Sequence, residues 1–284
     1  MEKSLDTPRE IVKADNALFR SRSRLKDVLS GRIFMAFASL VDEKDVAENG
    51  NFLEYSISAA SILDKNTGGD NYKQLREAAY HLVDQKIERR TGKNSFKLYT
   101  LFSTIEYKDG IIIGEFHKDL KPFFITALCN FTRLSLKDYL NLQSIYSQKI
   151  FGFLKSWDDK PEITIEVEEL HRILETPISL KTNFKDFRRR VLEQSYKDIT
   201  KKTSLKYEYE TIRTGRKITS IRFIFSKKIS LPVMKKKYDD TVEKKSRQNN
   251  KFFIIALDCI KEHGSACTGG HQTEHICDIC RRLR

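Results

Sequence analysis

One stretch towards the C-terminal end of the chain, residues 180–228, constrains the fold more than any other. Its first half has the 3.6-residue period of a helix, because apolar residues from Phe184 to Ile199 fall on one side of a helical wheel. After Thr203 the period changes to two, and apolar side chains alternate with polar ones on both sides of a glycine turn at residues 213–217. The pattern predicts one helix followed by one β-hairpin. Thr182 or Asn183 would cap the helix, and Arg189, Glu193 and Lys197 would project from the side opposite the apolar residues.

The same stretch carries most of the positive charge of the protein. Residues 181–228 contain 15 Lys or Arg and 5 Asp or Glu, a net charge of +10, whereas the whole 284-residue chain has a formal net charge of +13. A helix with a cationic outer face, followed by a hairpin with a cationic tip, is the outline of a winged helix, in which the helix enters a major groove and the wing follows the phosphates. The alternative is a solvated helix and a basic turn on an α+β domain of any other kind.

The composition is that of a globular protein with an anionic partner. Hydrophobic residues make up 39% of the chain, and 18 Phe and 11 Tyr supply material for cores, so the chain is not a disordered polyelectrolyte. A pI near 9.4 favours nucleic acid or another anionic surface. No apolar run is longer than that at residues 252–257, which is far shorter than the ~20 residues that span a bilayer. Residues 1–6 do not resemble a secretory signal. We therefore expect a cytoplasmic protein with no membrane partner.

The order of elements suggests that the winged-helix outline occurs twice. A helical pattern at 17–41 is followed by a strand at 52–57, a helix near 72–83, and strands at 96–107 and 111–116 with Asp109-Gly110 between them. A second series has a long helix at 131–157, a strand at 163–167, a short helix at 168–175, and then the basic helix and hairpin. The predicted fold class is α+β, with two tandem winged-helix domains. We divide the chain into a flexible N-terminus (1–15), a first winged-helix domain (16–130), a second that is the main DNA reader (131–228), a basic linker (229–250) and a helical Cys/His-rich tail (251–284).

The tail contains half of a zinc-site pattern. Cys277 and Cys280 are spaced so that one turn can present two thiolates to a metal. The other two ligands would be Cys267 and His271, or else Cys259 and His263. Against a metal site, Cys259 also fits the apolar side of a short helix. We expect no required cofactor, and a structural zinc in the tail is left open.

The sequence does not favour an enzyme. It has no Gly-x-x-x-x-Gly-Lys-Ser/Thr phosphate loop that would support ATP-driven unwinding. It also has no pair of histidines one residue apart, which a rolling-circle nickase would use to hold a metal. We predict a DNA-binding protein without catalytic residues. The alternatives are a winged-helix transcriptional repressor without a role in initiation, and a zinc-dependent nucleic-acid enzyme.

Three stretches together resemble the replication initiator (Rep) proteins of iteron-controlled plasmids, which have two winged-helix domains. The first is Phe-Lys-Asp-Phe-Arg-Arg-Arg-Val-Leu at 184–192, with Lys-Tyr-Glu-Tyr at 206–209 and Gly-Arg-Lys-Ile at 215–218. The second is residues 144–155, and the third is residues 40–45 with 72–75. The resemblance covers roughly residues 16–228 and leaves out the tail.

The resemblance implies a function at a plasmid origin. Such proteins bind short direct repeats (iterons) in double-stranded origin DNA as monomers, help to open the duplex, and recruit the host initiator and replicative helicase. As dimers they can bind an inverted repeat and repress their own promoter, so exchange between monomer and homodimer is expected.

The resemblance also assigns roles to residues. The base-reading role falls on Asn183, Arg189, Arg190 and Glu193. Phosphate contacts fall on Lys181, Lys185, Lys197, Lys201, Arg213, Arg216 and Lys217. Weaker candidates in the first domain are Lys73, Arg76, Arg89, Arg90 and Lys93. Arg188 is an exception, because its wheel position predicts that its stem packs towards the core and that its guanidinium pairs with an acid.

Overall fold

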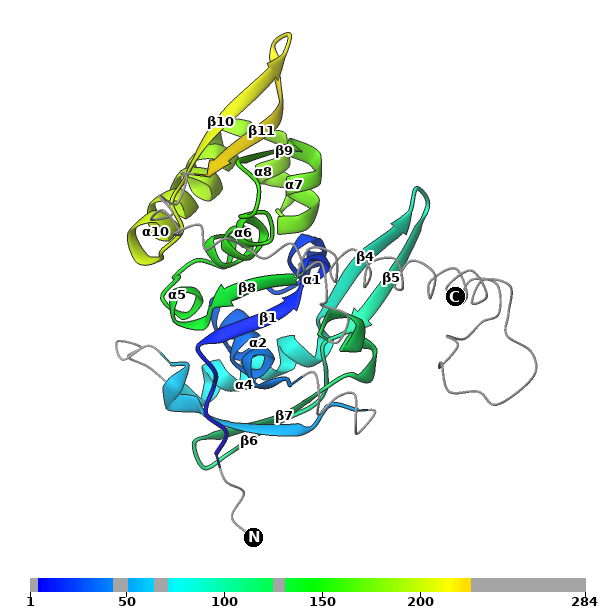
Figure 1. The fold of residues 1–284 in the computed structure, drawn as a ribbon, viewed down its shortest axis with the longest axis vertical. Coiled ribbons are helices and arrows are strands. Elements are labelled where there is room, and N and C mark those ends of the chain that lie inside the picture. The colour runs from blue at the N-terminus through cyan, green and yellow to red at the C-terminus, as the bar shows by residue number, and fades with distance from the viewer. Residues whose placement is uncertain (1–4, 43–50, 64–70, 125–130, 226–284) are drawn as a thin grey trace, which may run out of the picture. The chain divides into compact units, whose positions relative to one another are not determined.

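A similar order of helices and strands occurs twice in the chain. The structure is a computed structural model that describes residues 5–42, 51–63, 71–124 and 131–225, which all lie in one compact unit (Figure 1). The basic linker and the Cys/His-rich tail predicted from the sequence lie outside the described residues. No helix in the described ranges is long and apolar enough to cross a membrane.

The first series extends from β1 to η2. Its elements are β1 (Ile11–Asp15), α1 (Asn16–Arg20), β2 (Arg22–Ser23), α2 (Val28–Leu40), β3 (Glu54–Ser58), η1 (Ala59–Ser61), α4 (Asn71–Asp84), β4 (Lys86–Gly92), β5 (Ser95–Thr100), β6 (Phe102–Lys108), β7 (Ile111–Phe116) and η2 (Lys118–Phe123). The second series extends from β8 to β11. Its elements are β8 (Phe131–Ser135), α5 (Leu136–Leu140), α6 (Ile145–Lys155), β9 (Glu162–Glu166), α7 (Val167–Leu174), α8 (Ile178–Thr182), α9 (Phe184–Phe187), the π-helical turn η3 (Arg188–Glu193), α10 (Gln194–Lys202), β10 (Tyr207–Thr214) and β11 (Lys217–Phe225).

Two three-stranded sheets have the same strand order. In the first series β7 lies between β3 and β6, and in the second series β11 lies between β9 and β10, with every pair antiparallel. In both series the early strand therefore pairs with the last strand of the hairpin, and the helices come between them along the chain. The predicted α+β fold of two tandem winged-helix domains is confirmed.

A two-stranded sheet joins the beginnings of the two series. β1 pairs antiparallel with β8, and the middle residue of one strand, Lys13, is opposite the middle residue of the other, Arg133. Each strand leads directly into a short helix, α1 or α5. Antiparallel pairing of equivalent strands about their centres is the arrangement that a two-fold axis produces. The prediction that residues up to 15 are loose is wrong for Ile11–Asp15, because this strand pairs with one that the sequence assigned to a helix.

Both long predicted helices are interrupted. The helix expected at 17–41 is divided into α1 and α2, and Asp27 caps the second by accepting a hydrogen bond from the Ser30 amide at 2.7 Å. The helix expected at 131–157 is divided into β8, α5 and α6, and the two helices begin at the caps Ser135 and Ser144. These prediction errors share one cause. The spacing of apolar residues does not change where a short strand or a helix cap interrupts the helix, so the pattern predicts one continuous helix.

The first domain contains a hairpin that the sequence prediction missed. The strand expected at 96–107 is two strands, β5 and β6, separated at Leu101. β5 pairs with β4, and β4 pairs with β2, which gives an additional three-stranded sheet in the order β2-β4-β5.

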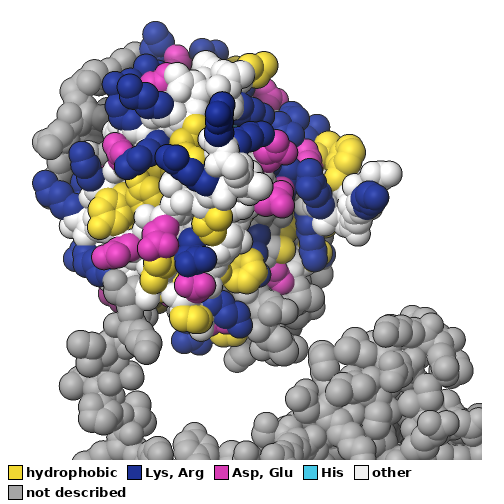
Figure 2. Space-filling model, turned by 90° about the horizontal axis from the view of Figure 1, so that it is seen from above, with side chains coloured by type: hydrophobic (Ala, Val, Ile, Leu, Met, Phe, Trp, Pro, Cys, Tyr) yellow, Lys and Arg dark blue, Asp and Glu magenta, His cyan; other side chains and the backbone are white. Residues whose placement is uncertain are grey.

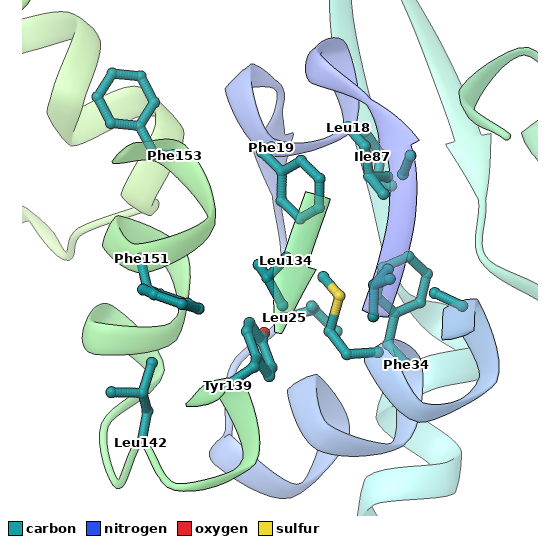
Figure 3. Packing of buried hydrophobic residues seen from close by; sticks show 14 of the residues in the cluster. Leu18, Phe19, Leu25, Phe34, Ile87, Leu134, Tyr139, Leu142, Phe151 and Phe153 are labelled. Carbon is teal, nitrogen blue, oxygen red and sulfur yellow. The ribbon is translucent and has the colours of Figure 1, made fainter. Parts of the chain in front are cut away.

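One hydrophobic core extends through both domains. Side chains of α6 face those of α1, α2, α5 and β8 across the interior (Figure 3), and Phe151 and Phe153 are both almost fully buried. Gly152 lies between them, and a Cβ at this position would be 2.7 Å from Phe19 Cδ1. The glycine thus permits α6 to approach α1 closely, so that the second domain is held against the first.

Candidate nucleic-acid interface

The basic helix begins at a well-formed cap. The side-chain oxygen of Asn183 accepts hydrogen bonds from the amides of Lys185 and Asp186 at 3.1 and 3.3 Å, and its Nδ2 donates to the Asp186 carboxylate at 2.9 Å. Of the two predicted N-cap candidates, Thr182 and Asn183, the structure selects Asn183. Asn183 remains exposed, but its amide is occupied in starting the helix.

From this cap the chain continues as α9, η3 and α10, and the π-helical turn determines which side chains point outwards. Val191 and Leu192 are adjacent in sequence and both buried, since the wider turn carries one extra residue past the core. The exposed side of the helix is a row at spacings of four, three and four, which we call the outer row. The outer row consists of Arg190, Gln194, Lys197 and Lys201, all exposed.

The outer row is available to a ligand. Among the described residues, none of its three cations lies within salt-bridge distance of a carboxylate. Lys185 on the first turn is also exposed and without an ion pair there. Arg189 is exposed as well, but its guanidinium lies 3.2 Å from Asp186. Of these two arginines of the basic helix, Arg190 can therefore contact DNA without giving up an ion pair, whereas Arg189 cannot.

The placement of Arg188 and Glu193 differs from the prediction. The two side chains pair with each other at 3.0 Å, and they flank Tyr209 on the hairpin. Burial, and then the charge of Glu193, raises the pKa of Tyr209, while Arg188 opposes this shift. Glu193 is half-buried rather than projecting with Arg189. The predicted ion pair of Arg188 is confirmed, but the predicted packing of its stem is wrong, because 56% of its side chain is exposed.

The hairpin β10–β11 forms the wing. Gly215 has φ of +63° at the turn, a conformation that glycine adopts without a Cβ penalty, and no neighbouring atom lies within 4 Å of a Cβ built there. The three cations of the tip, Arg213, Arg216 and Lys217, are all exposed. Figure 2 views the molecule from the end at which the wing projects in Figure 1, and Lys and Arg side chains are spread over this face.

Two predicted phosphate contacts line one hollow between the wing and the helices. Lys181 at the end of α8 and Lys217 on the wing border a hollow of about 830 Å³, and Arg22 of the first domain also lines it. His171 lies at the hollow, and burial, followed by the charge of Lys181, lowers its pKa. This histidine packs on the Phe187 ring at 4.2 Å, so it supports the helix rather than adding charge.

The first-domain candidates lie on two different elements. Lys73 and Arg76 are on the exposed side of α4, whereas Arg89 and Arg90 are on β4 and Lys93 is at the turn of the β4–β5 hairpin. All five are exposed. Some of them have local partners. The Arg76 guanidinium lies 5.2 Å from the centre of the Tyr80 ring, and Arg90 lies 3.5 Å from Glu169 of the second domain.

Comparison with family models identifies both halves of the chain. Residues 11–155 match the model described as Initiator Replication protein, WH1, and residues 166–225 match the model described as Initiator Rep protein, WH2. The chain belongs to this family of plasmid replication initiators. Comparison with individual curated proteins gives no match.

Family membership establishes a DNA-binding initiator built from two winged-helix domains, neither of which is a catalytic domain. The first model extends through α6, beyond the domain boundary that the sequence predicted after residue 130. The role of each DNA-binding candidate in this initiator stays a prediction, to which the structure adds position and exposure.

Sequence reasoning missed a charged network that joins the two domains of the initiator. Arg22 on β2 pairs with Glu88 on β4 at 3.2 Å and with Glu175 at the end of α7 at 2.9 Å. Arg172 of α7 lies 3.9 Å from the same Glu88. Lys149 of α6 is half-buried beside this network and donates hydrogen bonds to backbone oxygens of both domains. No local pattern in the sequence indicates which charges meet across a domain interface.

The sequence analysis also missed exposed apolar and aromatic side chains in the first domain. They include Tyr72 and Tyr80 on α4, and Phe96 and Leu98 on β5. Period-two alternation of Phe96 and Leu98 with Lys97 was a signal that could have indicated an exposed strand.

The zinc-site prediction is not tested by the geometry. Cys267, His271, Cys277 and Cys280 lie outside the described residues. In the ranges that the structure describes, no group of three or more His, Cys, Asp or Glu side chains is arranged to hold a metal ion.

Proposed function

We propose that this initiator binds short tandem repeats in double-stranded plasmid origin DNA and reads them mainly with its second domain. The observation that carries the proposal is the outer row, in which Arg190, Lys197 and Lys201 are exposed along one side of the helix and have no acidic partner among the described residues. An α-helix of this kind fits a major groove, and an arginine can bond guanine at two positions at once.

The wing would position the helix. Arg213, Arg216 and Lys217 at its tip are exposed and have no ion pair within the described ranges, which suits contacts with phosphates and supplies affinity that is independent of sequence. Lys181 would add a further phosphate contact from the other side of the hollow.

The first domain would supply a second contact on the same duplex. α4 comes before the β6–β7 hairpin along the chain, with β4 and β5 inserted between them, whereas α10 leads directly into β10–β11. α4 carries the exposed cations Lys73 and Arg76. Two helices in equivalent places favour a site with two contacted segments, and a site of about two helical turns is expected.

The test is selection of bound duplexes from a random-sequence pool at low and moderate salt, with the full-length protein. We expect a defined site of about two helical turns that is retained at moderate salt. Recovery of no consensus, with binding lost as salt rises, would mean that the charge acts only as an electrostatic surface and would refute the proposal.

Further steps of initiation rest on family membership. We propose that binding to repeats promotes opening of the origin, that host initiator and replicative helicase are recruited, and that a homodimer represses the initiator's own promoter. The rival function is repression alone. Tandem and inverted copies of the selected site distinguish the two, because tight binding to tandem copies favours initiation and binding only to inverted copies favours repression.

A further inference from the structure

The β4–β5 hairpin is a separate basic element of the first domain. Residues 86–100 contain five Lys or Arg and one Glu. The hairpin belongs to the sheet β2-β4-β5, which has no counterpart among the described residues of the second domain. In Figure 1 it extends away from the body of the first domain, as the wing extends from the second. The winged-helix architecture itself does not account for it.

Two large apolar side chains are exposed on this hairpin. Phe96 is 63% exposed and Leu98 is 42% exposed. They are two residues apart on β5 and therefore lie on the same face of the strand. β5 is also an edge strand of its sheet. Exposed apolar residues on an edge strand are a liability in a free protein and usually mark a contact surface.

Most of the charged side chains on this hairpin are cations. Arg90 is opposite Phe96 and Glu88 is opposite Leu98 in the strand register, so these side chains share a face. Glu88 is paired with Arg22, and Arg90 lies 3.5 Å from Glu169. Arg89 and Lys97 are opposite each other on the other face, and Lys93 is at the turn. In the described part of the chain, Arg89 and Lys93 have no carboxylate within salt-bridge distance. The hairpin therefore presents an exposed ring within a positive field.

We propose that the β4–β5 hairpin binds unpaired DNA, with Phe96 stacked on a base and the surrounding Lys and Arg side chains along the phosphates. Aromatic rings within a cationic surface are the combination that single-stranded nucleic acid uses, because every base has a face for stacking and every nucleotide carries a phosphate. In an intact duplex the base faces are covered by their neighbours, so the ring could reach them only after unstacking. The excess of cations disfavours a purely apolar protein partner.

The inference goes beyond the proposed reading of duplex repeats. Its ligand is the unpaired strand, and its residues are separate from the outer row and the wing. The hairpin would give an initiator a means of holding a strand after the duplex opens.

The test is equilibrium binding of the full-length protein to fluorescent oligo(dT) of about 20 nucleotides, followed by anisotropy at moderate salt. Phe96→Ala should weaken binding roughly tenfold, because one stacked base is lost. Phe96→Trp should restore the affinity. Tyr80→Ala is the matched control, since Tyr80 is 61% exposed and lies beside an arginine on another element, and it should bind as the wild type does.

An abasic strand of the same length separates stacking from charge. Because it keeps the phosphates and lacks the bases, Phe96→Ala and wild type should bind it equally. Equal oligo(dT) affinities for Phe96→Ala and wild type would overturn the inference, and so would losses of the same size in Phe96→Ala and Tyr80→Ala. If Phe96→Ala leaves oligo(dT) binding unchanged but alters the oligomeric state measured by sedimentation, this face instead contacts a second copy of the chain.

The duplex selection described above distinguishes the two proposals. Failure to recover a consensus removes the duplex-reading function but leaves the Phe96 effect on oligo(dT) intact. Conversely, Phe96→Ala should retain the duplex consensus, and loss of oligo(dT) binding alone supports the hairpin as a separate site.

Discussion

Arg190 offers the sharpest test of how this initiator reads DNA. Its side chain projects from the exposed side of the π-helical turn and has no ion pair among the described residues. Arg190→Ala should therefore change the free energy of unfolding by no more than about 0.5 kcal/mol. If Arg190 bonds a guanine in two places, the variant loses about 1–3 kcal/mol of discrimination, which lowers the ratio of specific to non-specific affinity roughly 5- to 150-fold.

Two neighbouring substitutions serve as controls. Arg189→Ala should have a smaller effect, because Arg189 must first leave Asp186, at 3.2 Å, and an exposed ion pair is worth about 0–1 kcal/mol. Lys217→Ala should weaken binding to all duplexes by a similar factor and reduce the slope of log K against log salt by about one. The three variants thus distinguish an arginine that reads a base, an arginine that is already paired with a carboxylate, and a lysine that contacts phosphate.

The measurement is equilibrium binding to the selected site and to versions with single base-pair changes, at three salt concentrations. Arg190→Ala should bind the selected site and one altered site almost equally, while other altered sites stay disfavoured. If Arg190→Ala and Lys217→Ala both lose affinity uniformly across all sequences, the outer row is not the reading surface and the argument from exposure fails.

Three further outcomes are expected. Gly152→Ala places a methyl group 2.7 Å from Phe19 Cδ1 and should lower the free energy of unfolding by about 1–3 kcal/mol. Urea unfolding measures this change, and an unchanged midpoint of the urea transition would contradict it. Burial lowers the pKa of Lys149 from 10.5 to about 8, so the folded state loses this proton first. The stability of the wild type relative to Lys149→Met should therefore rise by up to ~3 kcal/mol between pH 8 and 10.5, and a constant difference over this range would contradict the burial argument. If the tail holds zinc, the purified wild-type protein should contain about one zinc ion per chain, and the double variant Cys277→Ser, Cys280→Ser should contain none. Equal zinc contents of the wild type and the double variant would exclude this site.

Much of the second domain was predictable because its signals are local. The helix cap is at Asn183, one of the two predicted positions, and the buried positions Phe187 and Val191 and the glycine turn at Gly215 are as expected. Each depends on residues within a few positions of one another along the chain. Periodicity and turn chemistry report such features directly.

The candidate site was less predictable, because parts of it do not follow from local patterns. A helical wheel of 3.6 residues per turn cannot anticipate a π-helical turn, so Glu193 was placed outwards with Arg189 when it pairs with Arg188. The apolar pattern likewise extended a helix over β8, because nothing near Phe131–Ser135 indicates that its partner is β1, more than a hundred residues earlier.

The sequence by itself determined the charge, the two-domain α+β plan, the basic helix and the wing. Charge and alternation are properties of neighbouring residues, and no tertiary contact is needed to establish them. Only the tertiary structure decided that β1 pairs with β8, that Arg22 and Glu175 meet between the domains, and that Phe96 remains exposed on an edge strand. Strand pairing and burial depend on which distant segments the shared core brings together, and this information is held by the packing of the whole chain rather than by any one stretch.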